Sequence, residues 1–307
     1  MPLIRSENSA WPELPLADWR ETRDTLHMLT QIVGKVRGAL SPLVNHWWNV
    51  TLYVAPRGFT TSAIPFAGGL FEIRFDFFDH RLVIETSHGA SKSLPLGPRA
   101  VADFYADFIA ALASFEIHPK FHARPDEVPD PVPFAEDRVH HSYDPEQVRR
   151  FWRAMTAIEP VFQEFRSRFI GKCSPVHFFW GAFDLAVTRF CGRTAPERPG
   201  ADSIQREGYS HEVSSAGFWT GGASGVDEPV FYSYMAPEPE GFRQASIVPS
   251  AAFYHEGFGE FFLSYDFVRC SNSPADTLLT FFQSCYDAGA NLAHWDRAAL
   301  ERQPRKP

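Results

Sequence analysis

The same series of short motifs occurs twice along this chain, and this internal repeat limits the fold more than any other feature of the sequence. The first half contains, in order, Trp19-Arg20, Gly34-Lys35, Ser41-Pro42, His46-Trp47-Trp48 and the segment 71–77. The second half contains, in the same order, Trp152-Arg153, Gly171-Lys172, Ser174-Pro175, His177-Phe178-Phe179 and the segment 261–267. Any one pair of motifs matches by chance, but five pairs in the same order predict a duplicated structural unit.

Each copy is expected to fold as a helix, an antiparallel β-meander and a second helix. Apolar residues recur about every 3.6 positions, as in amphipathic helices, in two segments of the first copy: 18–38 and 101–115. The segments predicted as strands of the first copy are 46–54, 59–66, 71–77 and 81–86. The fold class that follows is α+β.

Two helix starts are indicated by their capping residues. Asp18, followed three residues later by Glu21, has the pattern of a capping box. Asp144-Pro145 followed by Gln147 has the N-cap, the first-turn proline and the amide of a second helix start. Pro160 lies within that second helix and is expected to kink or split it, because proline has no amide hydrogen.

The two copies set the expected domain boundaries. The predicted units are an extended lead-in at 1–17, the first copy at 18–118, a proline-rich linker at 119–143, the second copy at 144–295 with an insertion at about 196–257, and a tail at 296–307. A meander that is apolar on one face must bury that face. Either each sheet is covered by its own helices, or the two sheets join edge to edge into one curved sheet with a central cleft at the pseudo-two-fold axis.

The charge of the chain excludes some partners. The 307 residues carry a formal net charge of -8, and a general affinity for nucleic acid or an anionic membrane requires a basic surface instead. No apolar run approaches the roughly 18 residues of a membrane span, and the N-terminus has no signal-peptide pattern. The four cysteines contain no CxxC pair and fit no zinc module. We therefore expect a cytoplasmic protein with reduced thiols.

Several long strings look like those of an uncharacterised bacterial family that is catalogued as domain of unknown function 5996. The strings are WPELPLADW, LHMLTQIVGK, NHWWNVTLYVAPRGFTT, EVPDPVPF, SPVHFFWGAFDLAVTRFCGR, YSHEVSSAGFW, FYSYMAPEPEGF and a terminal ALE. The resemblance extends from Trp11 to about Glu301. It implies no activity, substrate, cofactor or site residue, so function has to be inferred from the residues themselves.

His177, His211 and Glu212 are the candidates for catalysis, and His46 is a candidate for substrate binding. By strand parity His46 and His177 point to the apolar side of their predicted strands, where a histidine is either hydrogen-bonded within the core or faces a pocket as an acid, base or ligand. His211 and Glu212 lie in the expected insertion, and they do not form the HExxH motif of a zinc protease. The adjacent pair His140-His141 has polar, proline-rich surroundings and is expected to be solvated.

Charged and aromatic side chains near the same strands are the candidates for substrate binding. Asp184, Arg189 and Arg193 lie along one predicted strand, and Arg57 occupies the corresponding position in the first copy. They form either a structural ion pair or an arginine site for a carboxylate or phosphate. Aromatic residues make up 15% of the chain, enough for a dense core or an aromatic pocket, and Trp48 either stacks on a planar ligand or lies in the core.

Two functions from different classes remain open. The first is an enzyme that uses histidine acid–base chemistry on a small anionic or planar metabolite, with His177, His211 and Glu212 as catalytic residues. The second is a non-catalytic protein for small-molecule binding or assembly. No metal site is visible in the spacing, and the sequence indicates neither a cofactor nor an oligomeric state.

Overall fold

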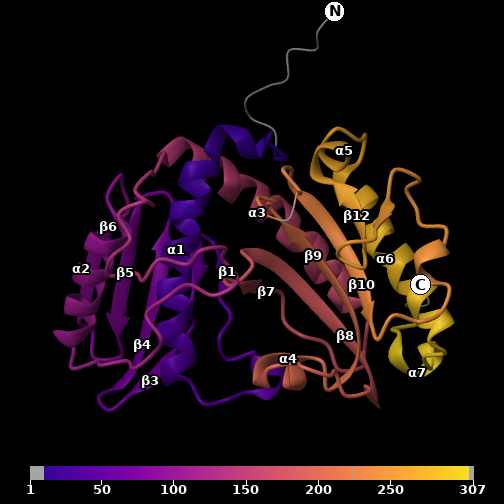
Figure 1. The fold of residues 1–307 in the computed structure, drawn as a ribbon, viewed down its shortest axis with the longest axis horizontal. Coiled ribbons are helices and arrows are strands. Elements are labelled where there is room, and N and C mark those ends of the chain that lie inside the picture. Colours follow the sequence, from indigo (N-terminus) through magenta and orange to yellow (C-terminus); the bar gives the residue numbers. More distant parts are fainter. Residues whose placement is uncertain (1–9, 224, 304–307) are drawn as a thin grey trace, which may run out of the picture.

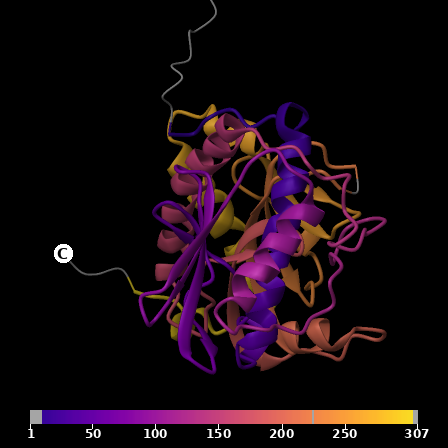
Figure 2. The ribbon, with the colours of Figure 1, turned by 90° about the vertical axis from the view of Figure 1, so that its left-hand side faces the viewer.

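The computed structural model describes residues 10–223 and 225–303, and it contains two antiparallel sheets with helices packed on them (Figure 1). The elements of the first half are α1 (Leu16–Leu40), the 3₁₀ turn η1 (Asn45–Trp47), β1 (Tyr53–Ala55), β2 (Gly58–Thr60), β3 (Ile64–Phe66), β4 (Gly69–Asp76), β5 (Arg81–Thr86), β6 (Ser91–Pro95) and α2 (Val101–Ala113). The first sheet has the strand order β1-β2-β4-β5-β6, and β3 pairs with β4. The helices α1 and α2 lie alongside each other next to this sheet (Figure 2).

The second half begins with the long helix α3 (Pro145–Ser167). Its other elements are β7 (His177–Phe179), β8 (Asp184–Thr194), α4 (Ser203–Gly208), β9 (His211–Trp219), β10 (Val230–Ala236), η2 (Phe242–Gln244), β11 (Phe253–His255), β12 (Glu260–Ser264), α5 (Tyr265–Arg269), α6 (Pro274–Leu292) and α7 (Arg297–Leu300). The second sheet has the strand order β11-β12-β10-β9-β8-β7. Within the described residues no helix is long and apolar enough to cross a membrane.

The two sheets meet where β1 approaches β7. Leu52 and Phe178 exchange two backbone hydrogen bonds, with N–O distances of 2.9 and 2.8 Å. Behind this bridge the rings of Phe59 and Phe178 stack at a centroid distance of 4.1 Å. The buried residues of both halves form one main hydrophobic cluster, so the halves share a core.

Local sequence signals are confirmed where they concern single elements. The helix α1 covers the predicted segment 18–38, and β5 has the predicted bounds 81–86. Asp144 caps α3 by accepting the amide hydrogens of Glu146 and Gln147 at 2.8 and 3.2 Å. One detail was wrong: α1 begins at Leu16 after Pro15, so Asp18 lies inside its first turn. Of the two effects expected of Pro160, it does not split α3, which continues to Ser167 with the proline inside it.

The predicted strand 46–54 was wrong at its start, because the chain there makes a tight turn. His46 and Trp47 have positive φ angles of 58° and 60°, which a strand does not allow. The side chain of Asn49 closes the turn by accepting the amide hydrogen of Val44 at 3.2 Å. A similar break at Ser62, with φ of 57°, divides the predicted strand 59–66 into β2 and β3.

The Trp19-Arg20 and Trp152-Arg153 pairs both lie in the long first helix of their half, but two other pairs on which the repeat was based do not match. His46 lies in the turn η1 whereas His177 lies in β7, and Asp76 ends β4 whereas Asp266 lies in α5. The order of elements nevertheless recurs, since each half has a long helix, a meander and a closing helix. The segment 196–257, which we expected to be an insertion, contains β9 and β10 in the middle of the second sheet.

Candidate functional site

A stripe of four buried polar residues runs along α1. Arg23, His27, Gln31 and Lys35 follow one another at intervals of four residues and therefore lie on one face of the helix. All four have an exposed surface of 8% or less. Buried polar groups require hydrogen-bond partners, and each of these side chains finds them in a distant segment of the chain.

The lower part of the stripe holds the proline-rich linker. The side-chain amide of Gln31 donates to the carbonyl of Asp126 at 2.7 Å and accepts the amide hydrogen of the same residue at 2.9 Å. Lys35 adds an ion pair with the carboxylate of Asp126 at 2.5 Å. These three contacts determine the position of the next residue, Glu127, which has a positive φ of 55°.

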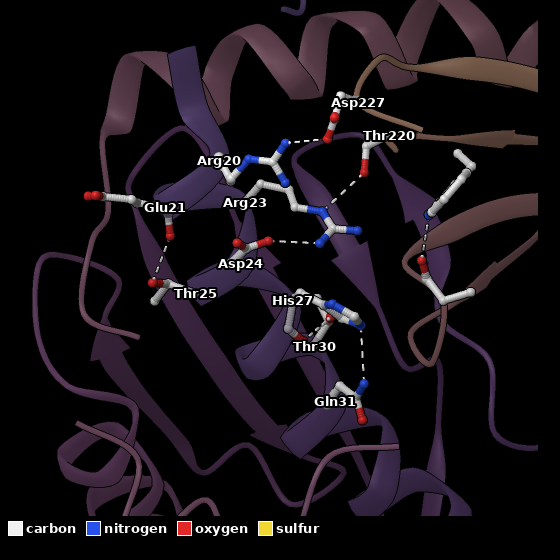
Figure 3. A network of polar contacts seen from close by, with 12 residues as sticks. Arg20, Glu21, Arg23, Asp24, Thr25, His27, Thr30, Gln31, Thr220 and Asp227 are labelled. Atoms are coloured by element: carbon white, nitrogen blue, oxygen red, sulfur yellow. Dashed lines mark hydrogen bonds and ion pairs between the residues drawn. The ribbon is translucent and has the colours of Figure 1, made fainter. Parts of the chain in front are cut away.

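The upper part of the stripe holds the second sheet (Figure 3). The Nε2 atom of His27 lies 2.9 and 2.8 Å from the carbonyl oxygens of Trp180 and Gly181, so it carries the proton and donates. Burial lowers the pKa of His27 to about 3, which keeps its ring neutral. Arg23 donates to the carboxylate of Asp24 at 2.8 Å and to the hydroxyl of Thr220 at 3.3 Å.

A cavity of about 440 Å³ lies between α1, the linker and the second sheet. Its charged and histidine wall residues are Arg23, Asp24 and His27 from α1, Glu127 and His140 from the linker, and Asp184 and Glu260 from the sheet. Its aromatic wall residues are Tyr209, Trp219, Tyr232, Tyr234, Phe258 and Phe262. A volume of this size, with aromatic side chains beside charged groups in its wall, lies within the range of small-molecule sites.

Two carboxyl groups of the sheet line this cavity, Asp184 buried and Glu260 half-buried, and both have raised pKa values. Burial raises the pKa of Asp184 to about 7, although a hydrogen bond from Tyr232 opposes the change. Burial, together with the charge of Asp184, raises the pKa of Glu260 to about 8. Near neutral pH Asp184 is therefore about half protonated and Glu260 is mostly protonated.

The third carboxyl group comes from the linker. Glu127 lies over Gly181, where a β-carbon would collide with its carboxylate, and burial raises its pKa. Within the described part of the chain, neither Glu127 nor Glu260 makes a side-chain hydrogen bond to another residue. Their oxygens are thus available to a molecule in the cavity.

The position of Tyr232 depends on a glycine in the neighbouring strand. Tyr232 on β10 pairs with Gly217 on β9, where any β-carbon would overlap the phenol ring. Because Gly217 has no side chain, the ring of Tyr232 can lie across β9, and its hydroxyl donates to the carboxyl of Asp184 on β8. Gly217 therefore allows an acid and a phenol to meet across three strands.

A carboxylate–histidine pair opens onto the cavity from the linker. The Nδ1 atom of His140 lies 2.7 Å from the carboxylate of Asp137, whose residue is fully buried. Asp137 also accepts the amide hydrogens of Val139 and His140, at 3.0 and 3.1 Å. The hydrogen bond from the histidine raises the pKa of His140, and Nε2 has no hydrogen-bond partner among the described residues. The imidazole is oriented so that Nε2 is free to exchange a proton.

Of the residues that the sequence suggested, only Asp184 lines this cavity. His46, Trp48 and His177 lie together near the junction of the two halves, where the Trp48 ring is 5.5 Å from His46 and 5.7 Å from His177. His211 is 5.8 Å from His46. Both ring nitrogens of His177 are buried and have no hydrogen-bond partner in the part of the chain that the structure describes, and burial lowers its pKa to about 3.

The ring of His46 is held by protein groups on both sides. The nitrogen of Lys172 lies 2.5 Å from Nε2 of His46, and Nδ1 of that ring donates to the carbonyl of Glu207. Both nitrogens of His46 are thus occupied.

The predicted arginine site is dispersed over three places. Arg189 is buried against the rings of Phe165 and Tyr286, at 3.5 and 4.3 Å from their centroids. Arg193 forms an ion pair with Glu212 at 2.6 Å, at the far end of β8. Arg57 lies in the first half and does not line the cavity.

Arg57 instead stabilises a turn, and this role can be measured. It donates two hydrogen bonds to Asp76, at 2.7 and 3.0 Å. Burial alone would raise the pKa of Asp76, but the hydrogen bonds from Arg57 and from two amides lower it. A carboxylate with a lowered pKa stabilises the fold above its unfolded pKa, and this contribution disappears as the pH falls through the folded value. We expect Asp76→Asn to lower the free energy of unfolding by about 1 kcal/mol at pH 7 and to have no effect near pH 2, as measured by urea denaturation. An equal loss at both pH values would contradict the ion pair.

Comparisons with known proteins place the chain in one family without adding a function. A family model described as "Family of unknown function (DUF5996)" matches residues 11–302, which confirms the resemblance seen in the sequence. No curated protein and no solved structure matches the chain.

Proposed function

The chain belongs to the DUF5996 family, whose function is not known, and we propose that it is an enzyme that transfers protons to and from a small molecule in the 440 Å³ cavity. The observation that carries this proposal is the Asp137–His140 pair, which opens onto a cavity that also contains two carboxyl groups with raised pKa values. Acid–base catalysis requires one group that accepts a proton and another that donates one, both within reach of the same molecule.

His140 is the proposed base. The Nδ1–H group donates to the carboxylate of Asp137, so the lone pair is on Nε2, which has no partner among residues 10–223 and 225–303. The same carboxylate stabilises the imidazolium that forms when Nε2 takes a proton. The hydrogen bond to Asp137 raises the pKa of His140, which makes the imidazole a stronger base.

The carboxyl pair Asp184 and Glu260 is the proposed acid. A carboxyl group at its ordinary pKa near 4 is ionised at neutral pH and has no proton to give. Burial raises the two pKa values to about 7 and about 8, so the pair keeps a proton under those conditions. The hydroxyl of Tyr232 donates to Asp184 and stabilises its charge after the proton has left.

The proposal can be tested without knowing the substrate. Purified protein is incubated with a fractionated metabolite extract, and the consumed compounds are identified by mass spectrometry. We expect the wild-type protein to convert at least one compound, and His140→Gln to do so about 100-fold more slowly, because removal of a general base has an effect of at least this size. The neighbouring His141 is exposed and does not line the cavity, so His141→Gln is a matched control. Conversion by His140→Gln at the wild-type rate would exclude His140 as the base.

The alternative function is non-catalytic binding of a small molecule in the same cavity. The aromatic rings and the carboxyl groups of the wall would bind a small molecule equally well in an enzyme and in a non-catalytic binding protein. The extract experiment separates the two, because a binding protein retains a compound and releases it unchanged.

We also propose that the two halves arose by duplication and that their sheets act as one curved sheet. The recurring order of helix, meander and helix supports the first idea. The two hydrogen bonds between Leu52 and Phe178 support the second, since they connect β1 with β7 at the facing edges.

A further inference from the structure

We propose that the molecule in this cavity carries an organic cation, an ammonium or guanidinium group, which the carboxyl groups and aromatic rings of the wall bind together. The inference rests on the proposed function, because it names the substrate class of the same cavity. It differs from the anionic or planar metabolite expected from the sequence.

The first step is the charge of the cavity wall. The guanidinium of Arg23 is neutralised by Asp24 at 2.8 Å, and His140 is paired with Asp137 at 2.7 Å. The carboxyl groups left over are those of Glu127, Asp184 and Glu260, and no lysine, arginine or histidine among the described residues lies within 4.0 Å of them as an ion-pair partner.

Asp184 is buried and Glu260 is half-buried, whereas Glu127 is exposed at the edge of the cavity. Burying a carboxylate without a positive partner is unfavourable, so Asp184 and Glu260 either keep their protons or require a cation. A cationic ligand would supply the partner that the protein does not. A charge on Asp184 raises the pKa of Glu260. When the cation binds, Glu127 and one of the two sheet carboxyl groups would ionise, and the other sheet carboxyl group would keep its proton. That remaining proton is the one the proposed acid needs.

The second step is the arrangement of the aromatic rings. Tyr232 and Tyr234 are stacked at 6.2 Å with an angle of 18°. Tyr209 lies 6.4 Å from Tyr234, but its ring already carries the guanidinium of Arg198 at 3.9 Å from the centroid. On another part of the wall, Phe258 lies 5.7 Å from Trp219. Aromatic faces attract organic cations through their quadrupole, most strongly where water is excluded.

A metal ion is a poorer occupant than an organic cation. Among the residues that the structure describes, no group of three or more His, Cys, Asp or Glu side chains is placed to hold a metal. Moreover, a bare metal ion would leave most of the 440 Å³ and the aromatic walls unused. An ammonium or guanidinium group attached to a carbon skeleton uses both the charges and the rings.

The test compares cations with neutral molecules of the same shape. The pairs are choline with 3,3-dimethylbutan-1-ol, phenyltrimethylammonium with tert-butylbenzene, and benzylamine with benzyl alcohol. Binding to the full-length protein is measured by calorimetry and by ligand-observed NMR at pH 6, 7.5 and 9. We expect at least one cation to bind about tenfold or more tightly than its neutral partner, with an affinity that increases with pH as the carboxyl groups lose protons.

Removing the three carboxylates should abolish this preference. In the variant Glu127→Gln/Asp184→Asn/Glu260→Gln we expect the affinity of the cation to fall about tenfold or more, to that of the neutral molecule. The control replaces the same number of carboxyl groups, at three exposed glutamates that become glutamine: Glu136, Glu197 and Glu240. The control variant should bind the cation as the wild type does. If no cation in the panel binds more tightly than its neutral partner, or if the two variants lose affinity equally, the inference is overturned.

The same measurements separate this inference from the proposed function. His140→Gln should bind the cation normally while it loses turnover. Normal turnover by that variant would remove the catalytic proposal and leave the cation preference intact. Equal binding of cation and neutral partner would remove the substrate class and leave the role of His140 intact.

Discussion

The double substitution Asp184→Asn/Glu260→Gln should stabilise the protein at pH 8 by about 4 kcal/mol and change its stability little at pH 3. Both pKa values are raised in the folded state, to about 7 and about 8, from ordinary values of 3.8 and 4.5. Below these ordinary values the two carboxyl groups are protonated in both the folded and the unfolded protein. The neutral replacements therefore change the free energy of unfolding little. As the pH rises to 8, both carboxyl groups ionise freely in the unfolded chain. In the folded protein they either stay protonated or ionise in an unfavourable buried environment, so the wild-type protein loses stability.

The expected size follows from the shifts. Each pKa unit corresponds to about 1.4 kcal/mol, so two shifts of roughly three units would give up to about 8 kcal/mol. We halve this because the cavity admits water and because the two groups interact. The side-chain amide introduced at position 184 can still accept the hydroxyl of Tyr232, so the substitution does not create an unpaired phenol.

Urea denaturation at pH 3 and pH 8 measures the effect. The variant Asp76→Asn is the natural comparison, because its carboxylate has a lowered pKa and its loss should destabilise the fold at high pH. Equal stability of the double variant and the wild type at pH 8 would mean that Asp184 and Glu260 are not held in their neutral forms. A gain in stability would indicate that these acids are kept for function at the expense of the fold.

The sequence predicted single elements better than it predicted the site. The cap at Asp144 and the bounds of β5 depend on neighbouring residues, and both agree with the structure. The turn at His46 departs from prediction because its positive φ is stabilised by the side chain of Asn49 and by contacts with the second half, which strand alternation does not reveal.

The site itself is assembled from segments that are far apart in the chain. Asp184 was among the predicted binding residues, but Glu127, Glu260 and His140 were not. His140 was expected to be solvated because its neighbours are polar and proline-rich, and its partner Asp137 is fully buried only in the folded chain. No local pattern links these residues.

One signal in the sequence does point to the site. The residues Arg23, His27, Gln31 and Lys35 repeat every four positions inside a helix that is otherwise largely apolar on its buried faces. A polar stripe on the buried face of a helix has to meet polar partners, so it marks a place where other segments converge. Here it identifies α1 as one wall of the cavity, although it does not identify the residues opposite.

The substitution Arg189→Ala should destabilise the protein by about 3–4 kcal/mol, whereas Arg193→Ala should cost less than about 1 kcal/mol. The sequence treats these residues alike, as two cations on one strand. In the structure Arg189 is 1% exposed and fills the space between Phe165 and Tyr286, and its guanidinium donates to the carbonyl of Phe165. The side chain of Arg193 is 48% exposed and pairs with Glu212 at 2.6 Å.

The reason for the large effect is packing more than charge. Burial lowers the pKa of Arg189 to about 10, so the side chain stays charged at neutral pH but is desolvated. Truncation to alanine would leave a void between α3 and α6 next to β8, and it would leave the carbonyl of Phe165 without its donor.

Arg189→Met separates the two contributions, because methionine fills much of the same volume without a charge or a donor. If packing dominates, Arg189→Met should recover most of the stability lost in Arg189→Ala, as measured by urea denaturation at pH 7. If the two variants are equally unstable, the guanidinium and its contacts with the rings of Phe165 and Tyr286 supply the stability instead. Either result concerns the core alone, since Arg189 does not line the cavity and its replacement should leave cation binding unchanged in the fraction that folds.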